Sequence, residues 1–308
     1  MNIFRWAWKQ PVILMSLTCL FWGGNTIAAR IAVDDISPYQ VTFGRWTLVS
    51  LGFALFYRQQ ILDAWQNLYG HRTYLILMGC SGFVLFNFLF YESGHRTTAL
   101  NIGILQGSIP IFVLIGAFLV YRARITWLQI GGVFTGFLGV FTVATGAVPS
   151  EILNVSFNLG DLLMITACLV WSGFTIGLRT KPPIPSIILF AIFCFVASFF
   201  SAPFAIYEIA TGQAKFPTVT GWLVLSYIAI CASMFGQLFY LRSVDLMGPS
   251  RTGMFLNLIP IVAAFLAVVL LNETFFLYHA LALVLILGGL WLSKDPSSEK
   301  IIKHRNKN

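Results

Sequence analysis

Charged side chains are scarce in this sequence. Asp, Glu, Lys and Arg make up only 10% of its 308 residues, whereas hydrophobic residues make up 58%. A soluble protein of this size could not cover its surface with so few charges, so the composition excludes an ordinary soluble domain. Apolar stretches of about twenty residues recur along the chain, and each is long enough to cross about 30 Å of hydrocarbon.

Two other patterns are absent. The short alternating segments typical of membrane barrels do not occur, so helices are left as the way to pair every backbone polar group in lipid. No CxxC pair occurs either. The cysteines lie inside apolar segments, so we interpret them as packing residues and expect no metal site and no cofactor. They are Cys19, Cys80, Cys168, Cys194 and Cys231.

The hydrophobic pattern predicts an all-α integral membrane protein with ten transmembrane helices. The first apolar stretch is longer than the core of a typical signal peptide and has an internal copy, so we interpret it as a mature helix. No soluble domain fits between the helices. We expect the helices at 12–33, 39–57, 74–93, 99–121, 125–145, 161–179, 185–206, 220–241, 250–271 and 275–293.

Basic residues are distributed unevenly between the two sides of this topology. The net charge of +8 alone would suit nucleic acid, but the basic residues sit in short loops and in the tail. With a cytoplasmic N-terminus, only Arg30, Arg96 and Lys215 face outward. That bias predicts a multi-pass protein of the cell (inner) membrane with both termini cytoplasmic, in contact with lipid and without a nucleic-acid partner. The inward set is Arg5, Lys9, Arg58, Arg72, Arg122, Arg124, Arg179, Lys181, Arg242, Arg251, Lys294, Lys300, Lys303, Arg305 and Lys307.

The chain contains an internal repeat. A shift of 149 residues aligns identical residues that shared hydrophobicity alone would not match, including Cys19/Cys168, Trp22/Trp171, Thr26/Thr175 and Arg30/Arg179. We therefore predict two five-helix units, 1–149 and 150–308. Because five is odd, the second unit enters the membrane with the opposite orientation. Inverted repeats are typical of secondary transporters, although they also build channels and scaffolds.

Several motifs resemble a known family. They are Trp-Gly-Gly-Asn at 22–25 with its echo at 171–173, Pro38 followed by Arg45, Asn257 to Pro260 followed by Glu273, and Gly160-Asp161. In this order they resemble the EamA-type permeases of the drug/metabolite transporter superfamily over about residues 12–293. The resemblance implies ten helices around a central cavity and transport, often export, of small metabolites. The family often has an acidic residue after helix four, where this chain has Ala123.

Pro110 and Pro260 lie at equivalent places in the two units, since a shift of 150 residues aligns them. Proline removes a donor from the helical ladder and clashes with the preceding turn. Paired interruptions of this kind indicate a transporter's binding site, although ordinary kinks with close helix packing would give the same pattern.

Aromatic, hydroxyl and amide side chains inside the apolar helices are the candidate substrate contacts. Trp and Thr at i and i+4 share one helix face, and an amphipathic ring beside a hydroxyl suits a substrate with apolar and polar parts. Buried amides need partners, so they either line a wet cavity or bond across helices. We expect substrate binding by Trp22, Thr26, Tyr91, Gln106, Trp171, Thr175, Tyr240 and Asn257.

Charged groups inside or beside the helices are further candidates. Arg45 is the basic residue well inside a predicted helix, and it suits either a substrate carboxylate or a structural role with Asp34, Asp35 or carbonyl groups. Glu92 and His95 suit either proton coupling or an ordinary wet loop.

These observations favour a secondary transporter of small amphipathic metabolites. We expect amino acids or related compounds, moved outward by alternating access, and leave a homodimer open. One alternative is an intramembrane serine protease of rhomboid-like type, because Gly79-Cys80-Ser81-Gly82 fits its GxSG pattern. A chance match among small residues explains that motif more simply. The other alternative is a non-transporting membrane subunit.

Overall fold

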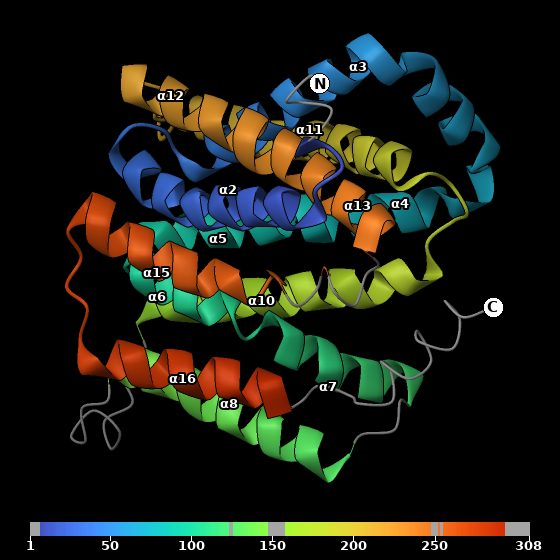
Figure 1. Ribbon diagram of the computed structural model, residues 1–308. Helices are drawn as coiled ribbons and strands as arrows, with labels where there is room; N and C mark the ends of the chain where they lie inside the picture. The colour runs from blue at the N-terminus through green and yellow to red at the C-terminus, as the bar shows by residue number, and fades with distance from the viewer. Residues whose placement is uncertain (1–6, 123–125, 147–157, 248–251, 253–254, 293–308) are drawn as a thin grey trace.

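The computed structural model describes residues 7–122, 126–146, 158–247, 252 and 255–292 (Figure 1). The predicted features at Ala123, Arg124, Arg251 and the basic tail from Lys294 onward lie outside these residues. The described chain is helical: α2 (Pro11–Ile31), α3 (Pro38–Asn67), α4 (Arg72–Gly79), α5 (Phe86–Gly94), α6 (Ala99–Gln106), α7 (Ile109–Tyr121), α8 (Trp127–Thr145), α10 (Leu159–Gly177), α11 (Ser186–Ala210), α12 (Val219–Tyr227), α13 (Gly236–Met247), α15 (Leu258–Leu271) and α16 (Leu277–Leu292). Two π-helical segments, Cys80–Leu85 and Ile228–Phe235, join α4 to α5 and α12 to α13.

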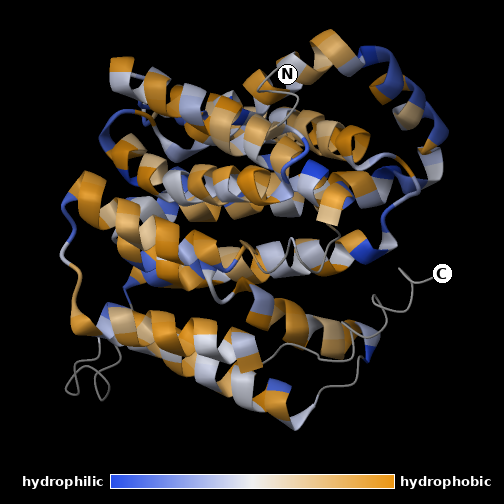
Figure 2. Cartoon of the chain, in the orientation of Figure 1, coloured by the Kyte–Doolittle hydropathy of each residue, from blue (hydrophilic) through white to orange (hydrophobic). Residues whose placement is uncertain are grey.

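Seven helical stretches in the described chain are long and apolar enough to cross a membrane, and α15 and α16 are shorter apolar helices. The seven are Pro11–Asp34, Tyr69–Gly94, Ala99–Tyr121, Trp127–Thr145, Leu159–Thr180, Ser186–Ala210 and Val219–Met247. Apolar residues run along the helices, and hydrophilic residues gather at their ends and in the loops (Figure 2). The protein is therefore a multi-pass membrane protein.

Helix α3 differs from the prediction at its C-terminal end. The sequence pattern ends this helix at 57, because the following residues are polar, but α3 continues to Asn67. The Gln59 amide donates to the Asp63 carboxylate at 2.9 Å one turn later, and both side chains face solvent. This extension is amphipathic, because the buried Ile61 lies among exposed polar residues, so a search for uniformly apolar stretches could not locate the end of the helix.

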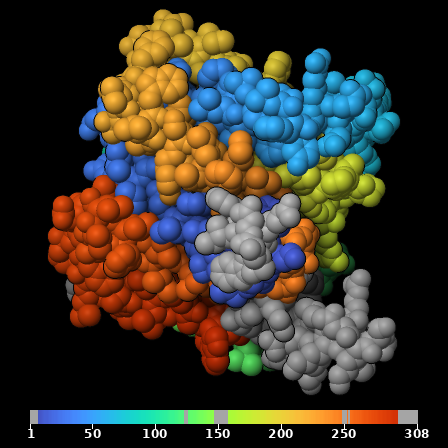
Figure 3. Space-filling model, turned by 45° about the horizontal axis from the view of Figure 1, so that its top comes forward, coloured from blue at the N-terminus to red at the C-terminus, as the bar shows by residue number. Residues whose placement is uncertain are grey.

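Helices from distant parts of the sequence pack against one another. Helix α2 packs against α13 and α15, and α10 packs against α5, α6 and α7. Helix α3 lies along α11, and α8 lies along α16. In the space-filling view, blue residues of α2 lie between the orange residues of α12 and α13 and the red residues near the C-terminal end (Figure 3).

The α8–α16 pair is held at very short range by glycines. A Cβ atom added to Gly289 would lie 2.4 Å from the Gly132 carbonyl oxygen and 2.7 Å from the Gly136 nitrogen. A Cβ on the adjacent Gly288 would meet nothing within 4 Å. Small residues that let two backbones approach closely are the usual means of helix association in membranes.

The loop between α15 and α16 is tied to the start of α6 by Glu273. Its carboxylate accepts the backbone N–H groups of Ala99 at 2.9 Å and Leu100 at 2.8 Å. The first N–H groups of a helix lack partners within the helix, and a carboxylate there also meets the positive end of the helix dipole. Glu273 therefore fixes the position of one helix end on another.

Replacing Glu273 with alanine is expected to destabilise the purified protein by about 1–2 kcal/mol, because two helix-end donors lose a charged acceptor. Thermal unfolding followed by intrinsic fluorescence measures the change. The matched control is Glu92→Ala, since Glu92 forms an exposed i,i+4 ion pair with Arg96 that contributes little. Equal stability of the two variants would contradict the capping role of Glu273.

Candidate functional site

A cavity of about 170 Å³ lies in the middle of the bundle. Aromatic rings form much of its wall, and amide, hydroxyl and guanidinium groups interrupt them. Its lining residues are Trp22, Asn25, Arg45, Trp46, Phe83, Phe86, Asn87, Phe90, Gln106, Gly107, Ile109, Pro110, Trp171, Phe190, Ala232, Ser233, Gln237, Leu256, Asn257, Ile259, Pro260, Leu287 and Leu290. The cavity is thus built by helices from both predicted units.

Two helix interruptions meet at this cavity. Helix α6 ends at Gln106 and α7 begins at Ile109, so Pro110 lies in the first turn of a new helix. Helix α15 begins at Leu258 after Asn257, so Pro260 has the equivalent place. Proline suits the first helical turn because its missing N–H would lack a partner there anyway. Each proline also leaves a carbonyl four residues earlier without its usual donor.

Matching cysteines reach carbonyl groups beside these interruptions. The Cys168 thiol lies 3.5 Å from the Leu105 carbonyl oxygen, and the Cys19 thiol lies 3.1 Å from the Phe255 carbonyl oxygen. These two cysteines are also buried, as expected for packing residues. A thiol is a weak donor, so each one adds to the hydrogen bonding of its carbonyl group; the Leu105 carbonyl oxygen also accepts the Ser108 backbone N–H at 3.0 Å.

The two π-helical segments occupy equivalent positions on either side of the cavity. They make backbone carbonyl groups available to side chains: the Trp46 indole donates to Phe83 at 2.7 Å, and the Trp22 indole donates to Ala232 at 2.9 Å. Neither segment was predicted from the sequence. The first one overlaps the Gly79-Cys80-Ser81-Gly82 run that was considered as a protease motif, and π-helical turns often lie at functional sites.

Ser81 belongs to the first of these π-helical segments. Its hydroxyl donates to the Met78 carbonyl oxygen at 3.2 Å, within the same helical stretch. A nucleophilic serine needs a base within hydrogen-bond reach, and this hydroxyl is engaged by its own backbone.

Arg45 extends from α3 into the cavity wall, and neutral groups hold it in place. Its Nε donates to the Ser233 hydroxyl at 2.6 Å, and its Nη1 donates to the Asn87 amide oxygen and the Tyr91 hydroxyl, each at 2.8 Å. The guanidinium carbon lies 4.5 Å from the centre of the Trp46 ring. The sequence suggested Asp34 and Asp35 as structural partners of Arg45, but both aspartates bind other residues.

The two aspartates proposed as partners of Arg45 face the loops. Asp34 lies 3.7 Å from the Lys215 ammonium group, and Asp35 accepts a hydrogen bond from the Thr218 hydroxyl. Among the residues that line the cavity, within the described chain, none is acidic. The cavity therefore carries a formal positive charge that no carboxylate neutralises.

The predicted substrate contacts divide into two groups. Trp22, Gln106, Trp171 and Asn257 line the cavity, together with both prolines and Arg45. Thr26 and Tyr91 do not line the cavity but form hydrogen bonds with residues that do. Thr26 accepts a hydrogen bond from the Gln106 amide at 2.9 Å, and Tyr91 donates to the Asn25 amide oxygen as well as holding Arg45.

The remaining two members lie farther from the cavity. The Thr175 hydroxyl donates to the Trp171 carbonyl oxygen one turn earlier in α10. The Tyr240 ring packs on Trp22, with their centroids 5.6 Å apart. Because neither lines the cavity, their effect on a substrate would pass through the two tryptophans.

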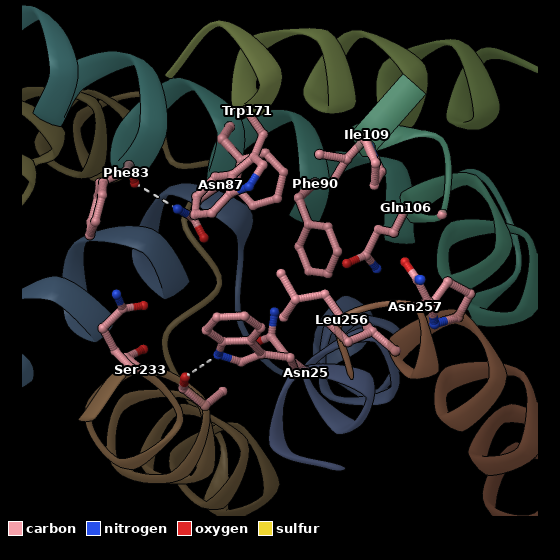
Figure 4. A pocket seen from close by; sticks show the side chains of 18 of the residues that line it. Asn25, Phe83, Asn87, Phe90, Gln106, Ile109, Trp171, Ser233, Leu256 and Asn257 are labelled. Atoms are coloured by element: carbon pink, nitrogen blue, oxygen red, sulfur yellow. Dashed lines mark hydrogen bonds between the residues drawn. The ribbon is translucent and has the colours of Figure 1, made fainter. Parts of the chain in front are cut away.

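The polar groups of the cavity gather at two ends. Asn87 and Ser233 lie at one end, whereas Gln106 and Asn257 lie at the other, with Phe90 between them (Figure 4). Asn25, Trp46 and Ser233 are among the lining residues that were not assigned a role from the sequence. The Trp-Gly-Gly-Asn motif could have indicated Asn25 as a site residue. Ser233 lies among small residues that do not indicate a binding site.

Glu92 and His95 lie away from the cavity. Glu92 forms an exposed ion pair with Arg96, at 2.9 Å between carboxylate and guanidinium. Burial lowers the pKa of the His95 imidazole below its ordinary value, and the Glu92 carboxylate partly opposes that shift. His95 is thus neutral at pH 7, beside a loop.

Acidification below about pH 6.5, the ordinary pKa of histidine, is expected to destabilise the protein through His95. Since the folded-state pKa is depressed, the unfolded chain binds the proton first, and stability falls as pH drops toward the folded pKa. His95→Gln should reduce this acid sensitivity in thermal unfolding measured from pH 7 to pH 5. The control is His71→Gln, at the start of α4; an unchanged pH dependence in His95→Gln would contradict the assignment.

Comparison with known proteins gives one family. Residues 9–145 and 158–294 each match the EamA-like transporter family, and the two matches are offset by 149 residues, since 158 − 9 = 149. Together they cover most of the chain. The offset is the same as the shift that aligns the internal repeat.

Curated relatives cover nearly the whole chain at low identity. The S-adenosylmethionine/S-adenosylhomocysteine transporter of Chlamydia muridarum is 25% identical, over 89% of this chain and 90% of its own. The probable amino-acid metabolite efflux pump of Escherichia coli is 23% identical, over 92% and 95%. A protein of known crystal structure shares the fold, with TM-score 0.62 and 17% identity over 92% and 96% of the two chains.

Proposed function

The chain belongs to the EamA-like transporter family, and we propose that it exports amino acids or related amphipathic compounds by alternating access. As a member of this family it is a secondary transporter rather than an enzyme, so the intramembrane protease is rejected. Its substrate is accordingly a small molecule. Ten transmembrane helices in two inverted units, 1–149 and 150–308, form the transport pathway. The observation that carries the proposal is the cavity between helices of both units.

Helix packing supports the inverted repeat. Exchanging the two units turns α2 into α10 and α15 into α7, and α2 packs on α15 as α10 packs on α7. The contacts of α2 with α13 and of α10 with α5 correspond in the same way. The α3–α11 and α8–α16 pairs map onto themselves. An arrangement that is unchanged by this exchange lets two similar halves swap conformations, which converts an outward-open state into an inward-open one.

Polar side chains tie the two units together at one end of the bundle. The Ser37 hydroxyl donates to Glu208 at 2.5 Å, and the Thr97 hydroxyl donates to Asp161 at 2.6 Å. Both lie at the end of the bundle opposite the expected cytoplasmic loops. In our proposal this is the outer end, closed in the present conformation, and both termini are cytoplasmic in the cell (inner) membrane.

The cavity lining supports a substrate with apolar and polar parts. Trp22 and Trp171 offer apolar surface, while Gln106 and Asn257 offer neutral hydrogen bonding. A quaternary cation is disfavoured because no acidic residue lines the described cavity. A nucleotide sugar is disfavoured because diphosphates require several basic groups. Two relatives also fit this class, one named as an S-adenosylmethionine/S-adenosylhomocysteine transporter and the other as a probable amino-acid metabolite efflux pump.

Counterflow into proteoliposomes tests this function. Liposomes containing the purified protein are preloaded with the unlabelled form of one solute and then given its labelled form; amino acids, a quaternary ammonium dye and a nucleotide sugar are tested in turn. We expect accumulation of amino acids alone. Accumulation of the dye or the sugar with amino acids inert would overturn the substrate assignment, and flux of no solute would favour the non-transporting subunit.

A further inference from the structure

The guanidinium group of Arg45 has donors that the protein leaves unused. Such a group carries five N–H bonds. The one on Nε is given to Ser233, and the two on Nη1 are given to Asn87 and Tyr91. Nη2 has no hydrogen-bond partner among the described residues, and Arg45 lines the cavity. Its two N–H bonds are therefore available to a ligand bound in that space.

The charge of Arg45 is also unmatched. The residue is 8% exposed, so its cation is largely withdrawn from water, and such a charge is costly unless an opposite charge or several acceptors compensate it. Ser233, Asn87 and Tyr91 fix the guanidinium orientation but are neutral. Its position is about 10 Å along α3 from Pro38, well inside the helix, which places it away from the acidic loop residues.

We propose that Nη2 of Arg45 binds the carboxylate of the transported substrate. This proposal rests on the transport function proposed above and defines the substrate class as carboxylic acids. The two N–H bonds of Nη2 diverge from one nitrogen, so it offers a charge-assisted hydrogen bond to a singly charged carboxylate, whereas a phosphate ester usually recruits several basic side chains. The end of the cavity formed by Arg45, Asn87 and Ser233 is then the carboxylate subsite.

The opposite end of the cavity suits the other polar group of such a substrate. The Gln106 amide nitrogen is engaged by Thr26, so its amide oxygen remains as an acceptor. Asn257 lies beside Gln106 at this end (Figure 4). Neutral amide oxygens accept hydrogen bonds from an ammonium group without requiring a second full charge. An ω-amino acid, whose two charged groups are separated by its carbon chain, therefore meets complementary groups at both ends.

Ligand-dependent thermal stabilisation of the purified full-length protein tests the subsite. The probes are matched pairs that differ only in the carboxylate: leucine and leucinamide, methionine and methioninamide, phenylalanine and phenylalaninamide. We expect the acids to bind and the amides to bind about tenfold to a hundredfold more weakly, as for loss of a hydrogen bond to a charged group. Arg45→Gln should weaken the acids by a similar factor, and Arg45→Lys should restore part of the affinity.

Arg58→Gln is the matched control, because Arg58 is exposed on the same helix and should leave binding unchanged. Equal binding of acids and amides, or unchanged acid binding in Arg45→Gln, would overturn the subsite while leaving the transport function intact. Binding of neither acids nor amides to the wild-type protein would overturn both. If Arg45→Gln does not fold, the wild-type comparison of acids with amides still decides the outcome.

Discussion

Gly289→Ala is expected to destabilise the protein by about 2–4 kcal/mol, more than any other single substitution considered for the bundle. The added methyl group would lie 2.4 Å from the Gly132 carbonyl oxygen and 2.7 Å from the Gly136 nitrogen. Both are backbone atoms of α8, so relief requires the two helices to separate. Thermal unfolding in detergent, followed by intrinsic fluorescence, measures the loss.

The neighbouring glycine supplies the control. A Cβ at Gly288 meets nothing within 4 Å, and alanine is a better helix former than glycine, so Gly288→Ala should be neutral or slightly stabilising. Comparable destabilisation by the two variants would show that the α8–α16 contact does not depend on close backbone approach at Gly289.

The Pro110→Ala/Pro260→Ala double variant is expected to lose about tenfold or more of its transport rate while keeping its expression level. Each alanine supplies an N–H group that can bond the carbonyl four residues earlier. The helix then extends backward through Gln106 or Asn257, both of which line the cavity. Initial rates of counterflow in proteoliposomes, normalised to the amount of reconstituted protein, measure the effect.

Each single variant serves as a control for the double variant. Restoring one helix leaves the other interruption intact, so each single change should reduce the rate less than the double change does. Pro203→Ala provides a further comparison, because Pro203 lies inside α11 and does not line the cavity. Full transport by the double variant would contradict a substrate site built on broken helices.

Hydrophobicity located most of the helices because lipid imposes a simple requirement on sequence. A segment that crosses the membrane must be apolar over its length, so helices such as α11 are visible from composition alone. The C-terminal end of α3 was not located in this way, because polar residues surround the buried Ile61 there. The breaks at Pro110 and Pro260 were foreseeable because proline restricts the backbone regardless of its surroundings.

The candidate site was less accessible to the sequence. Which face of a helix points inward depends on packing between distant segments, so Trp171 and Thr175 could not be separated by spacing alone. The π-helical turn that exposes the Phe83 carbonyl to Trp46 arises from one extra residue in a turn. Amino-acid composition does not predict where such a turn forms. The partners of Arg45 come from α5 and the second π-helical segment, far along the chain.

Thiol accessibility at one cavity position tests alternating access most directly. Leu287 lines the cavity with an apolar side chain, so Leu287→Cys leaves the polar groups in place; Cys80 and Cys231, which are partly exposed, are replaced by alanine. A membrane-impermeant thiol reagent is applied to right-side-out and to inverted vesicles, with and without transported amino acid. The proposed mechanism predicts labelling from both faces and slower labelling when the amino acid is present. Labelling from one face only, at a rate that the amino acid does not change, would contradict it.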